Sequence, residues 1–156
     1  VSDMEGVAVF NLYELSQEIA FNVDEWSKII SDASAVIYQF PFYWMSAPSL
    51  LKKWQDEVFT FLSKTPAVAG KPLTVVTTTG SEYEAYRSGG RNRFTTDELL
   101  RPYQVSAIHS GMSWQTPIVV YGMGTADAGK NIAEGANLYK QRVEMLIGSS
   151  NAGNNW

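Results

Sequence analysis

The sequence contains no cysteine, which excludes disulfide bonds, thiolate metal sites and cysteine nucleophiles. Its single histidine, His109, stands near the end of an expected helix and indicates a surface or packing role. No pair of carboxylates, histidine cluster or Ser/His/Asp spacing points to hydrolysis or metal catalysis. No uninterrupted apolar run approaches the roughly 20 residues that cross a bilayer, and no signal-peptide pattern is visible. These absences favour a protein of the reducing cytoplasm.

Basic residues are also few, because 12 Lys and Arg stand against 16 Asp and Glu, giving a net charge of −4. Nucleic-acid binding requires clustered positive charge, so we expect no nucleic-acid partner. The exception is a short run from Arg87 to Arg93 with three arginines among glycines. A solvated loop is the simpler interpretation, and contact with a dinucleotide phosphate is the alternative.

Hydrophobic residues make up 45% of the 156 residues, which is enough to form one hydrophobic core. We expect a single domain over residues 1–148, followed by a polar tail over residues 149–156. Short apolar runs alternate with longer amphipathic segments, which predicts a parallel α/β sheet covered by helices. Strands are expected at residues 7–12, 35–40, 73–80 and 117–121.

Capping residues locate the expected helices. Asn22 or Asp24 is expected to begin a helix that ends near residue 32, and Thr95 with Glu98 forms a capping-box pair. Ser46 is the expected N-cap of a helix whose buried face comprises Leu51, Trp54, Val58 and Phe61. A last helix over residues 127–147 is expected to end at Gly148 and to bury Ile132, Ala136, Tyr139, Val143 and Leu146.

Two of the expected strand ends have an unusual composition. The segment over residues 39–45 places four aromatic side chains in and beside a turn that should be exposed, which favours a flat ligand packed against them. A loop folded over the core, or a dimer contact, is the alternative. The segment over residues 78–81 offers hydroxyl and backbone N–H groups that suit the acceptors of a heterocycle. Ligands of parallel sheets bind at the carboxyl ends of strands, so together these segments predict a pocket for a planar, hydrogen-bonding molecule such as a flavin.

The run over residues 35–44, together with Ala47-Pro48, residues 50–52 and Trp54, resembles a hallmark stretch of the NAD(P)H dehydrogenase (quinone) family. That family includes bacterial modulators of drug activity and the ancillary flavoproteins of glutathione-gated potassium-efflux systems, and the bacterial efflux ancillaries are the most similar. The resemblance continues through Gly70-Lys71, residues 78–80, Tyr86 and residues 139–142.

The resemblance implies a flavodoxin-like three-layer sandwich with strand order 2-1-3-4-5, which binds FMN, or FAD, and usually forms a homodimer. By position, the loop along the flavin ring comprises Pro41, Phe42, Tyr43 and Trp44. The loop that donates hydrogen bonds to the polar edge of the ring comprises Thr78, Thr79, Gly80 and Ser81. Tyr86 matches a tyrosine placed near both flavin and substrate, where it would orient or protonate the acceptor.

The expected activity is ping-pong transfer of a hydride from NAD(P)H to FMN and then of two electrons to a quinone or similar acceptor. A flavin-carrying regulatory subunit that docks on a membrane potassium-efflux transporter is the second hypothesis. A flavodoxin-like domain that has lost its flavin and serves structurally is the third.

The sequence departs from the family pattern in three places. Asn92 occupies the position of a histidine that assists catalysis in the animal enzymes, so it offers a hydrogen bond without a proton shuttle. Residues 60–69 lack the Gly-x-Ala-Tyr stretch that normally reaches the partner's active site. Family members also begin with a strand and a phosphate-binding loop that are absent here, so we expect a βα unit of roughly 25–30 residues before Val1.

Overall fold

The computed structural model describes residues 1–15 and 20–152 and contains a parallel sheet between layers of helices. Strand β2 (Pro72–Thr78) pairs with β1 (Val36–Pro41) on one edge and with β4 (Ile118–Val120) on the other. The short strand β3 (Ser113–Trp114) pairs with the start of β2. The order β1-β2-β4 agrees with the 3-4-5 part of the expected order, and the predicted α/β class is confirmed.

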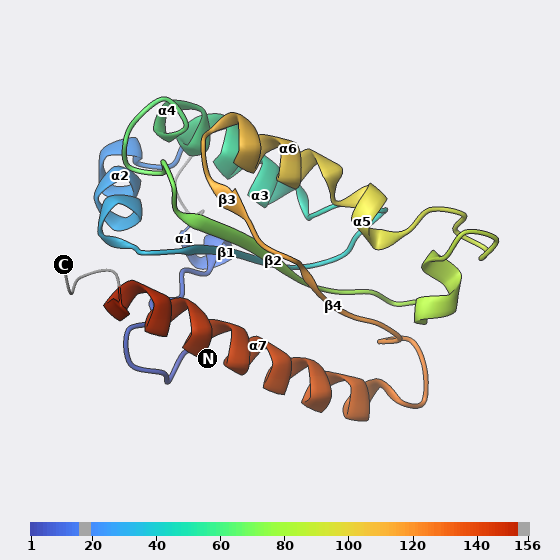
Figure 1. Ribbon diagram of the computed structural model, residues 1–156. Coiled ribbons are helices and arrows are strands. Elements are labelled where there is room, and N and C mark those ends of the chain that lie inside the picture. Colours follow the sequence, from blue (N-terminus) through green and yellow to red (C-terminus); the bar gives the residue numbers. More distant parts are fainter. Residues whose placement is uncertain (16–19, 153–156) are drawn as a thin grey trace.

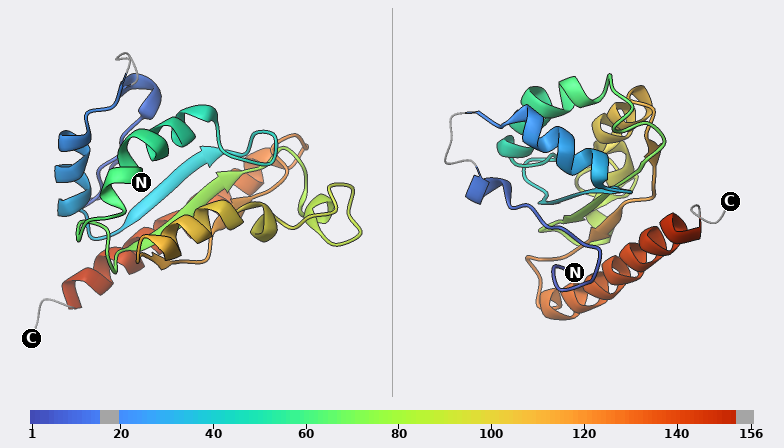
Figure 2. Two further views of the ribbon diagram at one scale, coloured as in Figure 1. Left: turned by 90° about the horizontal axis from the view of Figure 1, so that it is seen from above. Right: turned by 90° about the vertical axis from the view of Figure 1, so that its left-hand side faces the viewer.

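Helices cover both faces of this sheet (Figures 1 and 2). Helices α2 (Val23–Asp32), α3 (Ser49–Trp54) and α6 (Arg101–His109) lie on one face, and α7 (Ala128–Ala152) lies on the other. No helix in the described part of the chain is both long and apolar enough to span a membrane. The remaining elements are short: α1 (Leu12–Leu15), the π-helix η1 (Gln55–Phe59), α4 (Thr60–Leu62), the 3-10 helix η2 (Tyr83–Tyr86) and α5 (Thr96–Leu99).

The strand expected at residues 7–12 is wrong. Residues 7–11 form no regular element, and α1 begins at Leu12. Among the described residues, β1 pairs only with β2, so residues 7–11 find no ladder on its other edge. A strand needs a neighbour for its backbone N–H and C=O groups, and without one the apolar run leaves Val9 and Phe10 exposed.

Two of the three predicted helix caps are confirmed. The Asn22 side chain accepts hydrogen bonds from the N–H groups of Asp24 and Glu25, and Thr95 forms a complete capping box with Glu98. The backbone N–H of Thr95 holds the pKa of the Glu98 carboxyl below its usual value. The Ser46 cap is wrong, because α3 begins at Ser49 and Ser46 instead pairs with Tyr43 in a bridge.

A π-helical turn shifts the buried face of the segment that follows α3. Leu51, Trp54 and Val58 are buried as expected, but Phe61 is 59% exposed and Phe59 is buried instead. The turn over η1 is wider than an α-helical turn, so spacing counted at 3.6 residues per turn fails beyond it.

The buried face expected for α7 is confirmed in part, because Val143 is buried and Tyr139 and Leu146 are half-buried. Ile132 and Ala136 are exposed, and the helix instead approaches β4 closely at the buried Gly135. Gly135 allows this close approach, since a Cβ there would lie 2.3 Å from a methyl carbon of Val120. The helix also continues through Gly148 to Ala152, which corrects the expected end at Gly148, and residues 153–156 of the expected polar tail lie outside the described residues.

Gly135→Ala is expected to destabilise the protein by about 1–3 kcal/mol, because the new methyl group overpacks against the stiff β-branched side chain of Val120. The matched change in the same helix is Gly148→Ala, where a Cβ meets nothing within 4 Å. It is expected to be neutral or stabilising by up to about 1 kcal/mol, since alanine is the better helix former. Urea denaturation of both variants is the measurement, and a loss at Gly148 would show that the helix ends there after all.

Candidate functional site

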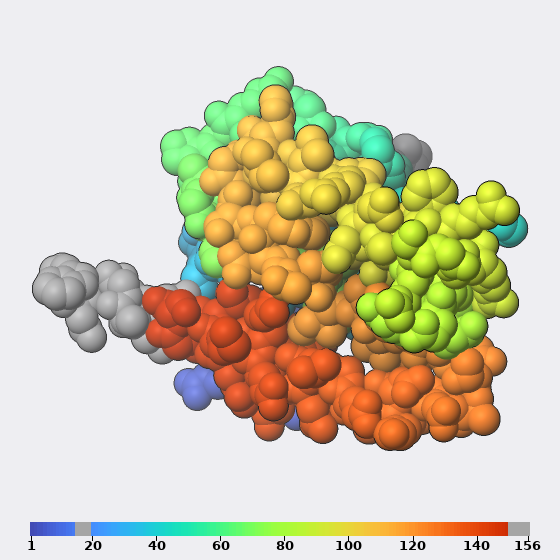
Figure 3. All heavy atoms as spheres, turned by 45° about the vertical axis from the view of Figure 1, so that its right-hand side comes forward, coloured from blue at the N-terminus to red at the C-terminus, as the bar shows by residue number. Residues whose placement is uncertain are grey.

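The loops that follow β1, β2 and β4 meet at the carboxyl edge of the sheet (Figure 1). Two backbone hydrogen bonds extend the ladders beyond the strands, from Phe42 N–H to Thr78 C=O and from Thr79 N–H to Val120 C=O, both at 2.9 Å. Figure 3 shows the yellow-green atoms of the loop after β2 beside the orange atoms of the β4–α7 loop. The aromatic segment and the polar segment singled out in the sequence are therefore neighbours at one edge.

The aromatic segment forms a tight, strained turn. Tyr43 and Ser46 exchange backbone hydrogen bonds of 2.8 and 2.9 Å, and between them Trp44 and Met45 adopt φ angles of 46° and 63°. Left-handed conformations cost side chains with a Cβ about 1–2 kcal/mol each. The turn leaves the Trp44 side chain 98% exposed. Strain that holds a large aromatic group in solvent is typical of binding sites.

The polar segment contains backbone donors without a partner among the described residues. The Gly80 and Ser81 carbonyls accept hydrogen bonds of 2.8 Å from Gly124 and Gly122 in the loop after β4, and the Thr79 hydroxyl donates to Ser81 C=O at 2.8 Å. These bonds fix the segment, but no hydrogen bond within the described residues uses the N–H of Gly80 or Ser81. A Cβ on Gly80 would meet nothing within 4 Å. Two backbone donors are thus available to a ligand.

Tyr86 is buried, at 6% exposure, between these segments and β4. Its ring centroid lies 6.3 Å from that of Phe42 and 5.9 Å from that of Tyr121. The Tyr121 hydroxyl is 2.7 Å from the Thr96 hydroxyl, and burial raises the pKa of Tyr121. Beside Tyr86 and Tyr121, a hollow of about 170 Å³ is also lined by Tyr83, Arg87, Ser88 and residues 95–97.

Tyr121 is not among the site residues predicted from the sequence. Its position indicates a place in the site, because Tyr121 ends the strand predicted at residues 117–121 and the ends of parallel strands share one edge of the sheet. Its backbone C=O accepts a hydrogen bond of 2.9 Å from the Asn131 amide, which links the site to α7.

Asn92 lies against the helical turn that carries Tyr86. Its backbone N–H donates to Ala85 C=O at 3.0 Å, and the side-chain Nδ2 is buried with no hydrogen-bond partner among the described residues. Gly90 allows the loop to lie this close to the helical turn, since a Cβ at residue 90 would lie 2.3 Å from the Glu84 carbonyl oxygen. A buried donor without a partner costs about 1–3 kcal/mol.

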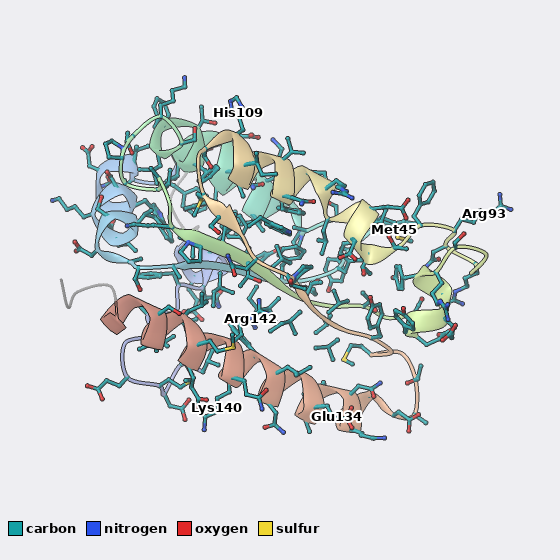
Figure 4. The ribbon with its side chains drawn as sticks, viewed as in Figure 1. Met45, Arg93, His109, Glu134, Lys140 and Arg142 are labelled. Atoms are coloured by element: carbon teal, nitrogen blue, oxygen red, sulfur yellow. The ribbon has the colours of Figure 1, made fainter. Side chains whose placement is uncertain are left out.

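The remaining candidate residues lie in different parts of the fold. Pro41 ends β1 opposite Thr78, and both line a second hollow of about 210 Å³ on the sheet face. His109 lies exposed at the far end of α6, away from Arg93 and the carboxyl edge (Figure 4). Within the described ranges, no group of acidic and histidine side chains is arranged to hold a metal ion.

The donor set fits the polar edge of a flavin. An isoalloxazine ring carries carbonyl and ring-nitrogen acceptors on one side, and the N–H groups of Gly80 and Ser81 have no partner among the described residues at this edge. Its flat faces match the aromatic surface that Trp44 and Tyr43 expose. The described residues that would hold the ring are therefore those of the two segments.

A model of the flavodoxin-like fold family matches residues 2–143. General stress protein 14 of Bacillus subtilis is 35% identical over 93% of this chain and 85% of its own length. Uncharacterized NAD(P)H oxidoreductase YdeQ of the same organism is 35% identical over 90% of this chain and 73% of its own. The glutathione-regulated potassium-efflux system ancillary protein KefG of Serratia proteamaculans is 35% identical over 76% of this chain and 67% of its own.

Solved structures share the architecture. A chain described as the thermophilic tryptophan halogenase of Streptomycin violaceusniger has a TM-score of 0.84 and 36% identity, covering 91% of this chain and 84% of that one. General stress protein 14 of Treponema denticola, in complex with FMN, has a TM-score of 0.80 and 27% identity over 89% and 81%. An NADPH-quinone reductase of P. pentosaceus has a TM-score of 0.65 and 30% identity over 74% and 72%. These names cover more than one reaction, so the shared fold alone does not select the electron acceptor.

Proposed function

The chain belongs to the flavodoxin-like fold family, and on this premise we propose that it is an FMN-dependent NAD(P)H oxidoreductase that reduces a quinone or a similar acceptor. The observation that carries this proposal is the carboxyl edge, where the N–H groups of Gly80 and Ser81 have no partner among the described residues and lie near an exposed aromatic turn. The FMN complex of a related structure and the relatives named NAD(P)H oxidoreductase and NADPH-quinone reductase support it.

When bound, FMN would supply the redox chemistry of the proposed ping-pong reaction, namely hydride acceptance from NAD(P)H and two-electron reduction of the acceptor. The protein supplies binding and orientation. The N–H groups of Gly80 and Ser81 would hold the polar edge of the ring, where negative charge develops on reduction. Tyr43 and Trp44 shield one face and position the nicotinamide or the quinone.

Tyr86 and Asn92 act on the acceptor. The Tyr86 hydroxyl donates a hydrogen bond to the acceptor oxygen, and the Asn92 amide donates without exchanging protons. Tyr121 and Phe42 hold the Tyr86 ring between them. A side chain that is fixed by packing loses little entropy when it meets its substrate.

The direct test uses the purified full-length protein. It is expected to carry FMN with a visible flavin spectrum and to oxidise NADPH only when a quinone is supplied. Steady-state kinetics with both substrates varied are expected to give the parallel lines of a ping-pong reaction. A protein that binds no flavin, or that holds flavin but transfers no electrons, would contradict the proposal.

Tyr86→Phe is expected to lower turnover about tenfold, which corresponds to about 1.4 kcal/mol in the activation barrier, while FMN remains bound. The matched control is Tyr83→Phe in the same helical turn, because Tyr83 is exposed. Quinone-dependent NADPH oxidation measures both variants. If turnover is unchanged in Tyr86→Phe, or falls equally in both, Tyr86 has no part in the reaction.

A regulatory role is the second candidate, and the 35% identity to a potassium-efflux ancillary protein favours it. In that role the flavin-carrying protein docks on a membrane transporter. The same Tyr86→Phe variant separates the two roles, because efflux that survives the loss of turnover supports docking. Efflux that falls in step with turnover supports the enzyme.

The proposed function also implies a cellular location and an oligomeric state. A consumer of NAD(P)H works where that dinucleotide is held, so we place the protein in the cytoplasm. We expect a homodimer, which sedimentation equilibrium tests.

A further inference from the structure

The three arginines between residues 87 and 93 have different surroundings. The Arg87 guanidinium lies 3.3 Å from a Glu84 carboxylate oxygen and 5.6 Å from the centre of the Tyr83 ring. Its charge is therefore balanced by a neighbour. Arg93 lies exposed at the outer end of the loop, with a φ of 62° (Figure 4).

Arg91 is also exposed, but its side chain contacts the donor segment. Its guanidinium donates a hydrogen bond to the Ser81 hydroxyl. No carboxylate in the described part of the chain lies within ion-pair distance of it. The tight contact of Gly90 with Glu84 and the bond from Asn92 N–H to Ala85 C=O fix the loop on both sides of Arg91. The Arg91 guanidinium therefore has no counter-ion among the described residues and is hydrogen-bonded to the segment that contains Gly80 and Ser81.

A positive charge near the bound ring would matter for the reduction of FMN, because reduction changes the charge of the ring. Two electrons and one proton, which together are the hydride of NAD(P)H, add one negative charge to the bound ring. A cation fixed at the donor edge stabilises that charge and interacts less with the neutral oxidised ring. The hydrogen bond to Ser81 keeps the exposed guanidinium near this segment, so that little reorganisation would accompany reduction.

We propose that Arg91 sets the redox balance of the site, by raising the preference of the protein for reduced over oxidised FMN. This role rests on the proposed function and adds a residue to it. Arg91 is a positioning and electrostatic residue here, because it reaches the donor segment through Ser81.

The test is the midpoint potential of FMN bound to the full-length protein, measured by equilibration with reference dyes. Arg91→Gln is expected to lower the ratio of reduced to oxidised affinity about tenfold, which is about 30 mV for a two-electron couple. The dissociation constant of oxidised FMN is expected to stay unchanged. Arg91→Lys keeps the charge and is expected to retain most of the potential.

Arg93→Gln is the matched control, because it removes the same formal charge from the same loop at an equally exposed position whose side chain does not bond Ser81. It is expected to leave the potential unchanged. An equal shift in Arg91→Gln and Arg93→Gln, or no shift in either, would overturn the proposal. So would loss of oxidised FMN from Arg91→Gln, since Arg91 would then build the site rather than bias it. Wild-type protein without FMN would defeat the proposed function itself, which is a distinct outcome.

Discussion

Leucine in place of Gly80 is expected to weaken FMN binding at least 100-fold, about 2.7 kcal/mol, while the free energy of unfolding stays the same. A Cβ at Gly80 meets nothing within 4 Å, so the first side-chain carbon is accommodated without a clash. The leucine would extend into the space that the flavin edge is proposed to fill, beside the two backbone donors. The measurement is a titration of FMN fluorescence, with urea denaturation of the same variant.

The control for this variant is Gly129→Leu. Gly129 lies in the first turn of α7, and a Cβ there also meets nothing within 4 Å. It is expected to leave FMN binding unchanged. Normal FMN affinity in Gly80→Leu would show that the ring lies elsewhere, whatever the outcome at Gly129.

Trp54→Ala is expected to lower the free energy of unfolding by about 3–5 kcal/mol, the range for truncating a buried aromatic residue. Trp54 is 3% exposed, and its ring lies 5.2 Å from Trp26, 5.9 Å from Tyr38 and 6.2 Å from Phe59. Truncation would leave a cavity in the centre of the core between β1 and the helices above it. Chemical denaturation followed by fluorescence measures the loss.

Phe61→Ala separates the observed packing from the packing that helical spacing predicts. Because Phe61 is exposed beyond the π-helical turn, its truncation is expected to change stability by no more than about 0.5 kcal/mol. If Phe61→Ala costs as much as Trp54→Ala, the segment is a regular α-helix and the shifted face is wrong.

The partial success of the sequence patterns has a physical basis. Strand positions and the Asn22 and Thr95 caps depend on residues that are close in the chain, so local composition predicts them. The carboxyl ends of parallel strands share one edge, so the proximity of residues 42 and 78 also follows once the strands are recognised.

The failures arise where packing between distant segments decides. Residues 7–12 have the composition of a strand, yet strand formation depends on a neighbouring ladder that their own sequence does not specify. Helical periodicity placed Ile132 in the core, whereas the contact of Gly135 with Val120 selects the row beside it.

By itself, the sequence determined a parallel α/β domain with an aromatic turn and a polar donor segment at consecutive strand ends, because each depends on short-range pattern and on the direction of parallel strands. Only the tertiary structure decided that Tyr121 packs against Tyr86, and that Arg91 rather than Arg87 or Arg93 rests on Ser81. Contacts of this kind depend on how loops fold back across one another, and the close approach of Gly90 to the Glu84 carbonyl has no counterpart in residue spacing.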